Sequence, residues 1–170
     1  MPSDMKKVWS ATAFFRTLTE TNKLAVEKGF RYVLISGLQG LEQAVASMQN
    51  TKAFVMVSEN AVGTTNLDNS PRTRRTRTVF LAMRYKMDDM TARQTCKDIM
   101  AELHRQFMSK LILEKTRLEE NMQFLEPQTT LQEAPDYLIP GTAICMFEIT
   151  VDTHIDLQYN ADEWITTPNN

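Results

Sequence analysis

The sequence of 170 residues contains few of the residues on which enzymes and disulfide-stabilised proteins depend: two histidines, two cysteines and five glycines. It has no glycine-rich phosphate loop, no nucleophile elbow, no His-Glu-x-x-His and no Cys-x-x-Cys. We therefore expect a protein that is not an enzyme and that holds no cofactor. Cys96 lies in a helical pattern and Cys145 in a strand pattern, which predicts two buried thiols rather than a disulfide.

Long apolar runs are also missing. None approaches the roughly 20 residues needed to span a bilayer, and the first residues, MPSDMKKVWSATAFF, have too short an apolar stretch for a secretory signal. These observations predict no membrane partner and a protein kept in the cytosol.

The length and the 42% hydrophobic content suit one folded domain. We place this domain at residues 1–160 and expect a C-terminal tail at 161–170.

Basic residues are absent from the last third of the chain. Residues 119–170 carry ten Asp or Glu and no Lys or Arg, whereas residues 71–118 carry five acidic and twelve basic residues. The net charge of −2 therefore hides a middle third of +7 (12 − 5) and a final third of −10 (0 − 10). Such an asymmetry favours association between unlike surfaces.

The first half of the chain alternates between helical and extended patterns. Apolar residues recur at three- and four-residue spacings and then in short β-branched runs. The expected elements are a helix from Met5 to Lys28, a strand at 30–36, a helix from Leu38 to Gln49 and a strand at 52–60. The turn-forming stretch AVGTTNLDNSP follows and predicts a long exposed loop, which we expect to be mobile over residues 59–74.

The second half has the clearest patterns. Alternation over residues 75–87 predicts a strand, and Asp88 and Asp89 precede a helical pattern from Thr91 to Glu119 with His104 beside its apolar stripe. Two further strands are expected, at 121–127 and from 142 toward Tyr159. The order predicts an α+β fold: a single domain with a mixed, mostly antiparallel sheet, packed on one face by the long helix plus the N-terminal helix.

Four arginines stand at the start of the strand expected at 75–87: Arg72, Arg74, Arg75 and Arg77. No aromatic residue lies between Ser70 and Val79 to stack on bases, and the isoelectric point is about 5.7, so nucleic acid is an unlikely partner. We expect these arginines to contact acidic residues of an adjacent subunit, such as Glu148, Asp152 and Asp156. A nucleic-acid-binding accessory protein stays open as an alternative, as does a solvated strand edge guarded by charge.

A metal site is the third possibility. Asp152, His154 and Asp156 would project from one face if the last strand continued past them. Such a set could bind a hard divalent cation, but no further ligands are spaced to complete the coordination sphere. We therefore expect no metal, with these three residues as the weak candidate.

The order of elements resembles that of the tail-terminator and head-to-tail joining proteins of tailed bacteriophages and prophages. The resemblance is carried by L-x-G-L-x-x-A at 38–44, KAFVMVSEN at 52–60, RTVFLAMRYKMDD at 77–89 before the long helix, and GTAICMFEITVDTHIDLQY at 141–159. It implies a virion structural protein, assembled in the bacterial host cytoplasm, that forms a ring on the tail tube, commonly a hexamer. The implied partners are further copies of the chain, the tail-tube protein and the head connector. It also implies that the loop at 59–74 orders on assembly.

Overall fold

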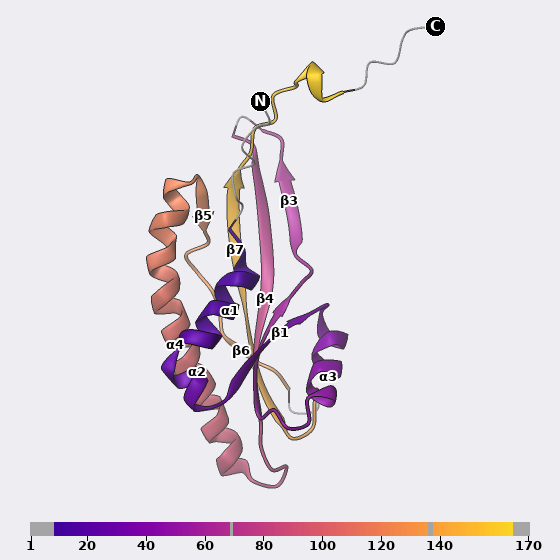
Figure 1. Cartoon of the computed structure of the whole chain (residues 1–170), viewed down its shortest axis with the longest axis vertical. Coiled ribbons are helices and arrows are strands. Elements are labelled where there is room, and N and C mark those ends of the chain that lie inside the picture. Colours follow the sequence, from indigo (N-terminus) through magenta and orange to yellow (C-terminus); the bar gives the residue numbers. More distant parts are fainter. Residues whose placement is uncertain (1–8, 69, 136–137, 165–170) are drawn as a thin grey trace, which may run out of the picture.

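The computed structural model describes residues 9–68, 70–135 and 138–164 (Figure 1). It has a mixed seven-stranded sheet with helices packed against it, so the predicted α+β class is confirmed. The helices are α1 (Ala11–Thr21), α2 (Lys23–Glu27), α3 (Leu38–Ser47), α4 (Met90–Glu120) and the short 3-10 helix η1 (Ala161–Glu163). The strands are β1 (Phe30–Ile35), β2 (Ala53–Ser58), β3 (Val62–Asn66), β4 (Arg72–Arg84), β5 (Gln123–Leu125), β6 (Gln132–Glu133) and β7 (Thr142–His154).

The centre of the sheet is the antiparallel pair β4 and β7. Each has 13 residues, and they are paired over their whole length, from Arg72 opposite His154 to Arg84 opposite Thr142. At a rise of about 3.3 Å per residue this ribbon is about 40 Å long. The strand order is β1-β2-β4-β7-β5, with β3 beside β4 and β6 beside β7, and only β1 and β2 are parallel.

One face of the sheet is covered by α1, α2 and α4 (Figure 1). The long-helix prediction is confirmed, and its stripe of Cys96, Met100, Leu103, Phe107 and Leu111 is buried here. The strand alternation is confirmed as well, because Val79, Leu81 and Met83 of β4 and the odd-numbered residues 143–151 of β7 belong to this core. A contiguous apolar core of this kind supplies most of the driving force for folding.

The second face is partly covered, which the sequence did not predict. Helix α3 packs Leu41 and Val45 against Phe54, Phe80 and Ile144. Helical periodicity shows that a helix has an apolar side but does not say which face of a sheet that side meets. This second core lies at the end of the sheet where β4 leads into α4, and it does not include the half of β4 that precedes Val79.

The predicted single helix from Met5 to Lys28 is wrong within the described residues, and Met5 to Val8 lie outside them. Asn22 separates α1 from α2 because its backbone is extended and its Oδ1 accepts a hydrogen bond from the Ala25 amide at 2.9 Å. Asparagine is a strong N-cap residue and competes with helix continuation in this way. The apolar spacing continues across the break, which is why periodicity alone suggested one helix.

The predicted loop at 59–74 is also wrong, because Val62–Asn66 forms β3 and β4 begins at Arg72. Strands β2 and β3 pair one after the other with the same edge of β4. Between them the chain bulges, because four residues, 58–61, lie opposite two residues of β4, Arg77 and Thr78. The predicted exposure is confirmed, since all five residues of β3 are exposed. Strand pairing overrides the weak local propensity of this polar stretch.

The ends of two strands also differ from expectation. Strand β4 spans residues 72–84 rather than 75–87, and β7 ends at His154 rather than continuing to Tyr159. Beyond His154 the chain turns, and Asp156 accepts a hydrogen bond from the Gln158 amide at 2.9 Å. Aspartate side chains favour such turns over strand pairing. Of the expected tail, residues 165–170 lie outside the described part of the chain.

Cys96 and Cys145 are free and buried, as predicted. Burial, together with the nearby Glu133 carboxylate, raises the pKa of the Cys145 thiol to about 11. The thiolate, which is the reactive form, is therefore strongly disfavoured at neutral pH.

Over the described ranges, no helix combines the length and the apolarity needed to cross a membrane.

Candidate interaction surface at the distal end of the sheet

The end of the sheet formed by β3, residues 72–78 of β4 and residues 148–154 of β7 carries the candidate residues, and we name it the distal end (Figure 1, top). Strand alternation divides its four arginines between two faces. Arg72 and Arg74 lie on the face away from α4. Arg75 and Arg77 lie on the helix-covered face, beside Trp9, Ile149 and Val151. The arginines therefore do not form one basic cluster.

Arg74 is paired within its own chain. It lies directly opposite Asp152 in the β4–β7 ladder, with Nη1 at 3.6 Å from the Asp152 carboxylate, and Nη2 donates to the Glu126 carboxylate at 2.6 Å. The contact between arginine and Asp152 that was expected across a subunit boundary is thus made inside one subunit. The Arg74 and Glu126 side chains are more than a third exposed, so each pair contributes at most about 1 kcal/mol to stability.

Arg72 lies over the ring of Phe124 on β5, with its guanidinium carbon 5.2 Å from the ring centroid. This cation–π contact fixes the guanidinium at the edge of the uncovered face. On the same face, closer to the centre of the sheet than Arg72 and Arg74, Thr76 of β4 and Thr150 of β7 share a hydrogen bond of 2.7 Å. The distal half of this face is therefore polar and internally bonded.

Arg77 has a structural role that the sequence did not indicate. Its Nη1 donates to the carbonyl of Ser58 at 2.7 Å and to the carbonyl of Glu59. Both carbonyls belong to the bulge between β2 and β3, whose backbone lacks regular ladder partners. Arg77 therefore fixes the direction in which β3 leaves the end of β2.

Replacing Arg77 by alanine is expected to lower the free energy of unfolding by about 1–3 kcal/mol, because two bulge carbonyls lose a charged donor. Urea unfolding followed by circular dichroism measures the change. Arg75→Ala is the matched control: this exposed side chain lies on the same face of the same strand, and its loss should cost less than about 0.5 kcal/mol. Equal effects of the two variants would contradict this role for Arg77.

The acidic candidates do not form one surface. Glu148 is exposed on the uncovered face and borders a shallow hollow with Thr78, Thr130 and Gln132. Asp152 lies on the same face, whereas Asp156 lies beyond the end of β7. The weak metal-site candidates Asp152, His154 and Asp156 do not form a ligand group, and Asp152 is paired with Arg74. Among the described residues no group of three His, Cys, Asp or Glu side chains is placed to hold a metal ion.

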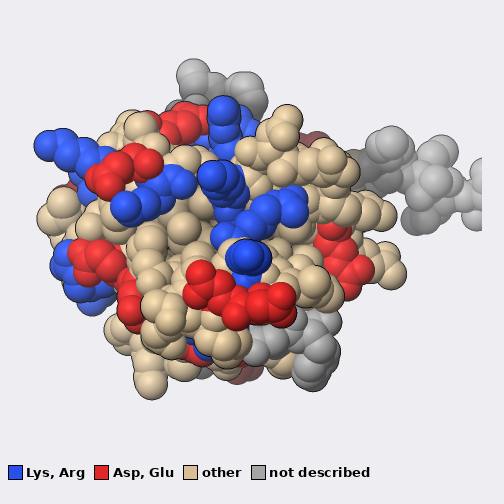
Figure 2. All heavy atoms as spheres, turned by 90° about the horizontal axis from the view of Figure 1, so that it is seen from below, with Lys and Arg blue, Asp and Glu red and all other residues tan. Residues whose placement is uncertain are grey.

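Residues of the basic middle third pair with residues of the acidic last third at both ends of the sheet. Antiparallel pairing places the basic start of β4 beside the acidic end of β7, while Arg84 and the following basic residues lie about 40 Å away at the opposite end. Figure 2 shows that opposite end, where basic side chains gather over the middle with acidic side chains around them. Lys97, for example, forms an ion pair with Glu133 there.

His104 lies at the boundary of the core, as its place beside the helical stripe suggested. Its ring contacts Phe147 edge-on, with centroids 4.7 Å apart, and its buried Nε2 has no hydrogen-bond partner among the described residues. Burial lowers the pKa of this imidazole, so it is neutral at pH 7.

Two exposed features were missed by the sequence reasoning. One is β3, whose only sequence signal was the β-branched run around Val62, Thr64 and Thr65. The other is the segment after β7, which presents Tyr159 and Trp164 to solvent.

Compared with known proteins, the sequence matches no family model and no curated protein.

Proposed function

We propose that this chain is a non-enzymatic virion structural protein of a tailed phage or prophage, assembled in the host cytoplasm, which forms a homo-oligomeric ring at the end of the tail tube. The proposal rests on the resemblance in the order of elements and on one structural observation, the free edge of β3. Further copies of the chain, the tail-tube protein and the head connector are the proposed partners.

The free edge of β3 is suited to pairing with another chain. Within the described part of the protein, β3 pairs with β4 alone. Natural edge strands are usually protected by charged residues, proline or a bulge. The bulge before β3 is present, but the strand itself, Val62-Gly63-Thr64-Thr65-Asn66, has neither a charge nor a proline, and Val62 is 75% exposed.

An edge of this kind supports assembly by strand addition. The backbone groups of the added strand supply the hydrogen bonds, and alternate side chains supply the specificity. The bulge and Arg77 fix the position at which β3 leaves the end of β2. In the proposed ring, the β3–β4 hairpin takes the role that the resemblance assigns to a loop that orders on assembly.

Introducing lysines at Val62 and Thr64 is expected to convert the ring into a folded monomer, because charges on an edge strand oppose strand addition. Light scattering measures the mass of the assembly, and electron microscopy shows whether the protein caps tubes grown from the tail-tube protein of the same genome. The control is Gln49→Lys/Gln94→Lys, which adds the same charge at exposed positions away from β3 and should leave the ring intact.

A monomer of the unmodified protein at high concentration, with and without tubes, would contradict the proposal. The nucleic-acid alternative is not favoured by any contact described above, since Arg74 and Arg77 are already engaged within the chain. A salt-dependent DNA-binding curve that is lost in the fourfold Arg→Ala variant would support it instead.

A further inference from the structure

The segment after β7, residues 155–164, leaves the domain and points away from the helices (Figure 1). We name it the C-terminal arm. Its base is tied to the β3–β4 hairpin by a hydrogen bond from the Ile155 amide to the Pro71 carbonyl at 3.1 Å. Further along, its hydrogen bonds join near neighbours, such as the Asp162 amide to Asn160 Oδ1 at 3.1 Å. The arm is therefore ordered locally while its side chains face solvent.

The exposed side chains of the arm are those typical of protein interfaces. Tyr159 is 76% exposed and Trp164 is 65% exposed, and their rings are stacked with centroids 6.3 Å apart. Leu157 is also exposed. Tryptophan and tyrosine in such positions commonly dominate binding energy once they are buried in a partner. The arm carries Asp156, Asp162 and Glu163 and no basic residue.

A groove of about 630 Å³ runs between α1 and the C-terminal half of α4. Trp9, Phe14 and Leu18 of the α1 side and Leu118 of α4 line its apolar floor. Lys110 and Arg117 stand at its α4 rim, where Glu114 is already paired with Arg117 at 3.3 Å. The exposed Leu113 lies on the same side of α4, one turn from Arg117.

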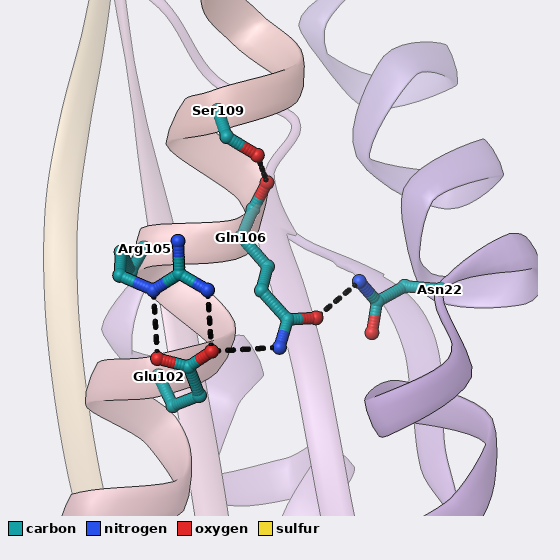
Figure 3. A network of polar contacts seen from close by, with 5 residues as sticks. All are labelled: Asn22, Glu102, Arg105, Gln106 and Ser109. Carbon is teal, nitrogen blue, oxygen red and sulfur yellow. Dashed lines mark hydrogen bonds and ion pairs between the residues drawn. The ribbon is translucent and has the colours of Figure 1, made fainter.

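A polar network beside the groove joins the junction of α1 and α2 to α4 (Figure 3). Asn22 donates to Gln106 Oε1 at 2.8 Å, and Gln106 Nε2 in turn donates to Glu102 at 2.8 Å. Hydrogen bonds from Arg105 and Gln106 lower the pKa of Glu102 to about 2, so this carboxylate is ionised at neutral pH. A surface prepared in this way needs little reorganisation when it binds.

We propose that the C-terminal arm of one copy docks in the α1–α4 groove of a second copy, with Trp164 and Tyr159 on the apolar floor and the acidic arm residues near Lys110 and Arg117. The arm and the groove are complementary in chemistry, since an acidic segment with exposed aromatic rings meets an apolar floor beside Lys110 and Arg117. The arm leaves β7 in the direction away from its own groove, which favours an occupant from another molecule.

This inference rests on the proposed ring and adds a contact to it. Arm and groove are different surfaces, so each copy gives an arm to one neighbour and receives an arm from the other. Such head-to-tail contacts generate closed rings when the rotation between neighbours closes. Arms exchanged in this way also raise the effective concentration for the second contact, at β3.

Disulfide trapping between two variants tests the docking. One chain carries Ala161→Cys in the arm, and a second, longer tagged chain carries Thr17→Cys in the groove; both positions are exposed, whereas the natural Cys96 and Cys145 are buried. Mild oxidation is expected to yield the mixed dimer. Tyr159→Ala/Trp164→Ala in the arm chain should reduce its yield by on the order of tenfold or more. Gln49→Cys, on another part of the surface, is the matched control for the groove position.

A yield no higher than that of Gln49→Cys would overturn the proposal. So would an intramolecular disulfide in a chain carrying both Ala161→Cys and Thr17→Cys, because the arm would then occupy its own groove. A ring that persists in Tyr159→Ala/Trp164→Ala would leave the proposed function standing, because the contact at β3 remains. An unchanged yield of the mixed dimer with this arm variant would remove the arm contact. A mixed dimer from a protein that forms no ring would support the arm contact and count against the proposed function.

Discussion

Replacing Phe15 by alanine is expected to lower the free energy of unfolding by about 3–5 kcal/mol, the range found when a large core aromatic side chain is truncated. Phe15 is fully buried where α1 meets the sheet and α4. Its ring lies 5.8 Å from that of Phe147 on β7 and 5.9 Å from that of Phe107 on α4. Truncation removes contacts with both layers and leaves a cavity that neither layer can close.

The loss should be large in relation to the total, because domains of this size are stable by only about 5–15 kcal/mol. Urea unfolding followed by circular dichroism measures it. Phe15→Leu is the control: it keeps an apolar side chain of similar reach and should lose less than half as much. A cost below about 1 kcal/mol for Phe15→Ala would mean that α1 does not pack on the sheet as described.

Replacing Arg84 by alanine is expected to lower the free energy of unfolding by about 2–4 kcal/mol, since half-buried backbone acceptors lose a charged donor. Arg84 Nε donates to the Thr51 carbonyl at 2.9 Å, and its Nη2 donates to the carbonyls of Val45 and Met48 at the C-terminal end of α3. Its guanidinium also lies over Phe54, 5.7 Å from the ring centroid. One side chain thus joins β4 to the end of α3.

Arg84→Lys separates charge from geometry. Lysine keeps a positive charge near the negative end of the α3 dipole but cannot donate to three carbonyls in a fixed fork. We expect it to recover about half of the loss. Hydrogen exchange should show faster exchange in α3 than in α4 for Arg84→Ala; uniform protection of both helices would contradict the role assigned to Arg84.

Arg84 also shows a limit of pattern reasoning. Alternation correctly placed it on the face opposite Val79, Leu81 and Met83. The sequence assigned no helix to that face, whereas α3 and the turn after it cover it. A period of two residues tells which side a residue lies on, but the element that covers that side comes from elsewhere in the chain.

The arginines near the distal end show the same limit for charge. Their number and spacing in the sequence suggested one basic surface facing an acidic partner. Strand alternation separates Arg72 and Arg74 from Arg75 and Arg77, and pairing with β7 places Asp152 beside Arg74. Within the chain, Arg74 therefore already has acidic partners, while a contact with an adjacent subunit stays a prediction.

The sequence by itself determined the fold class, the long helix α4 with its buried stripe, the inward residues of β4 and β7, and the free cysteines. These features follow from local periodicity and composition, which act over a few neighbouring residues. Only the tertiary structure decided that residues 62–66 form a strand, that α3 covers the second face and that Arg74 and Lys97 of the middle third pair with acidic residues of the last third. Strand β3 depends on its pairing with the neighbouring β4, and the other two features depend on which distant segments become neighbours. Pairing of β4 with β7 joins residues that are 58 (142 − 84) to 82 (154 − 72) positions apart and leaves no periodic signal along the chain.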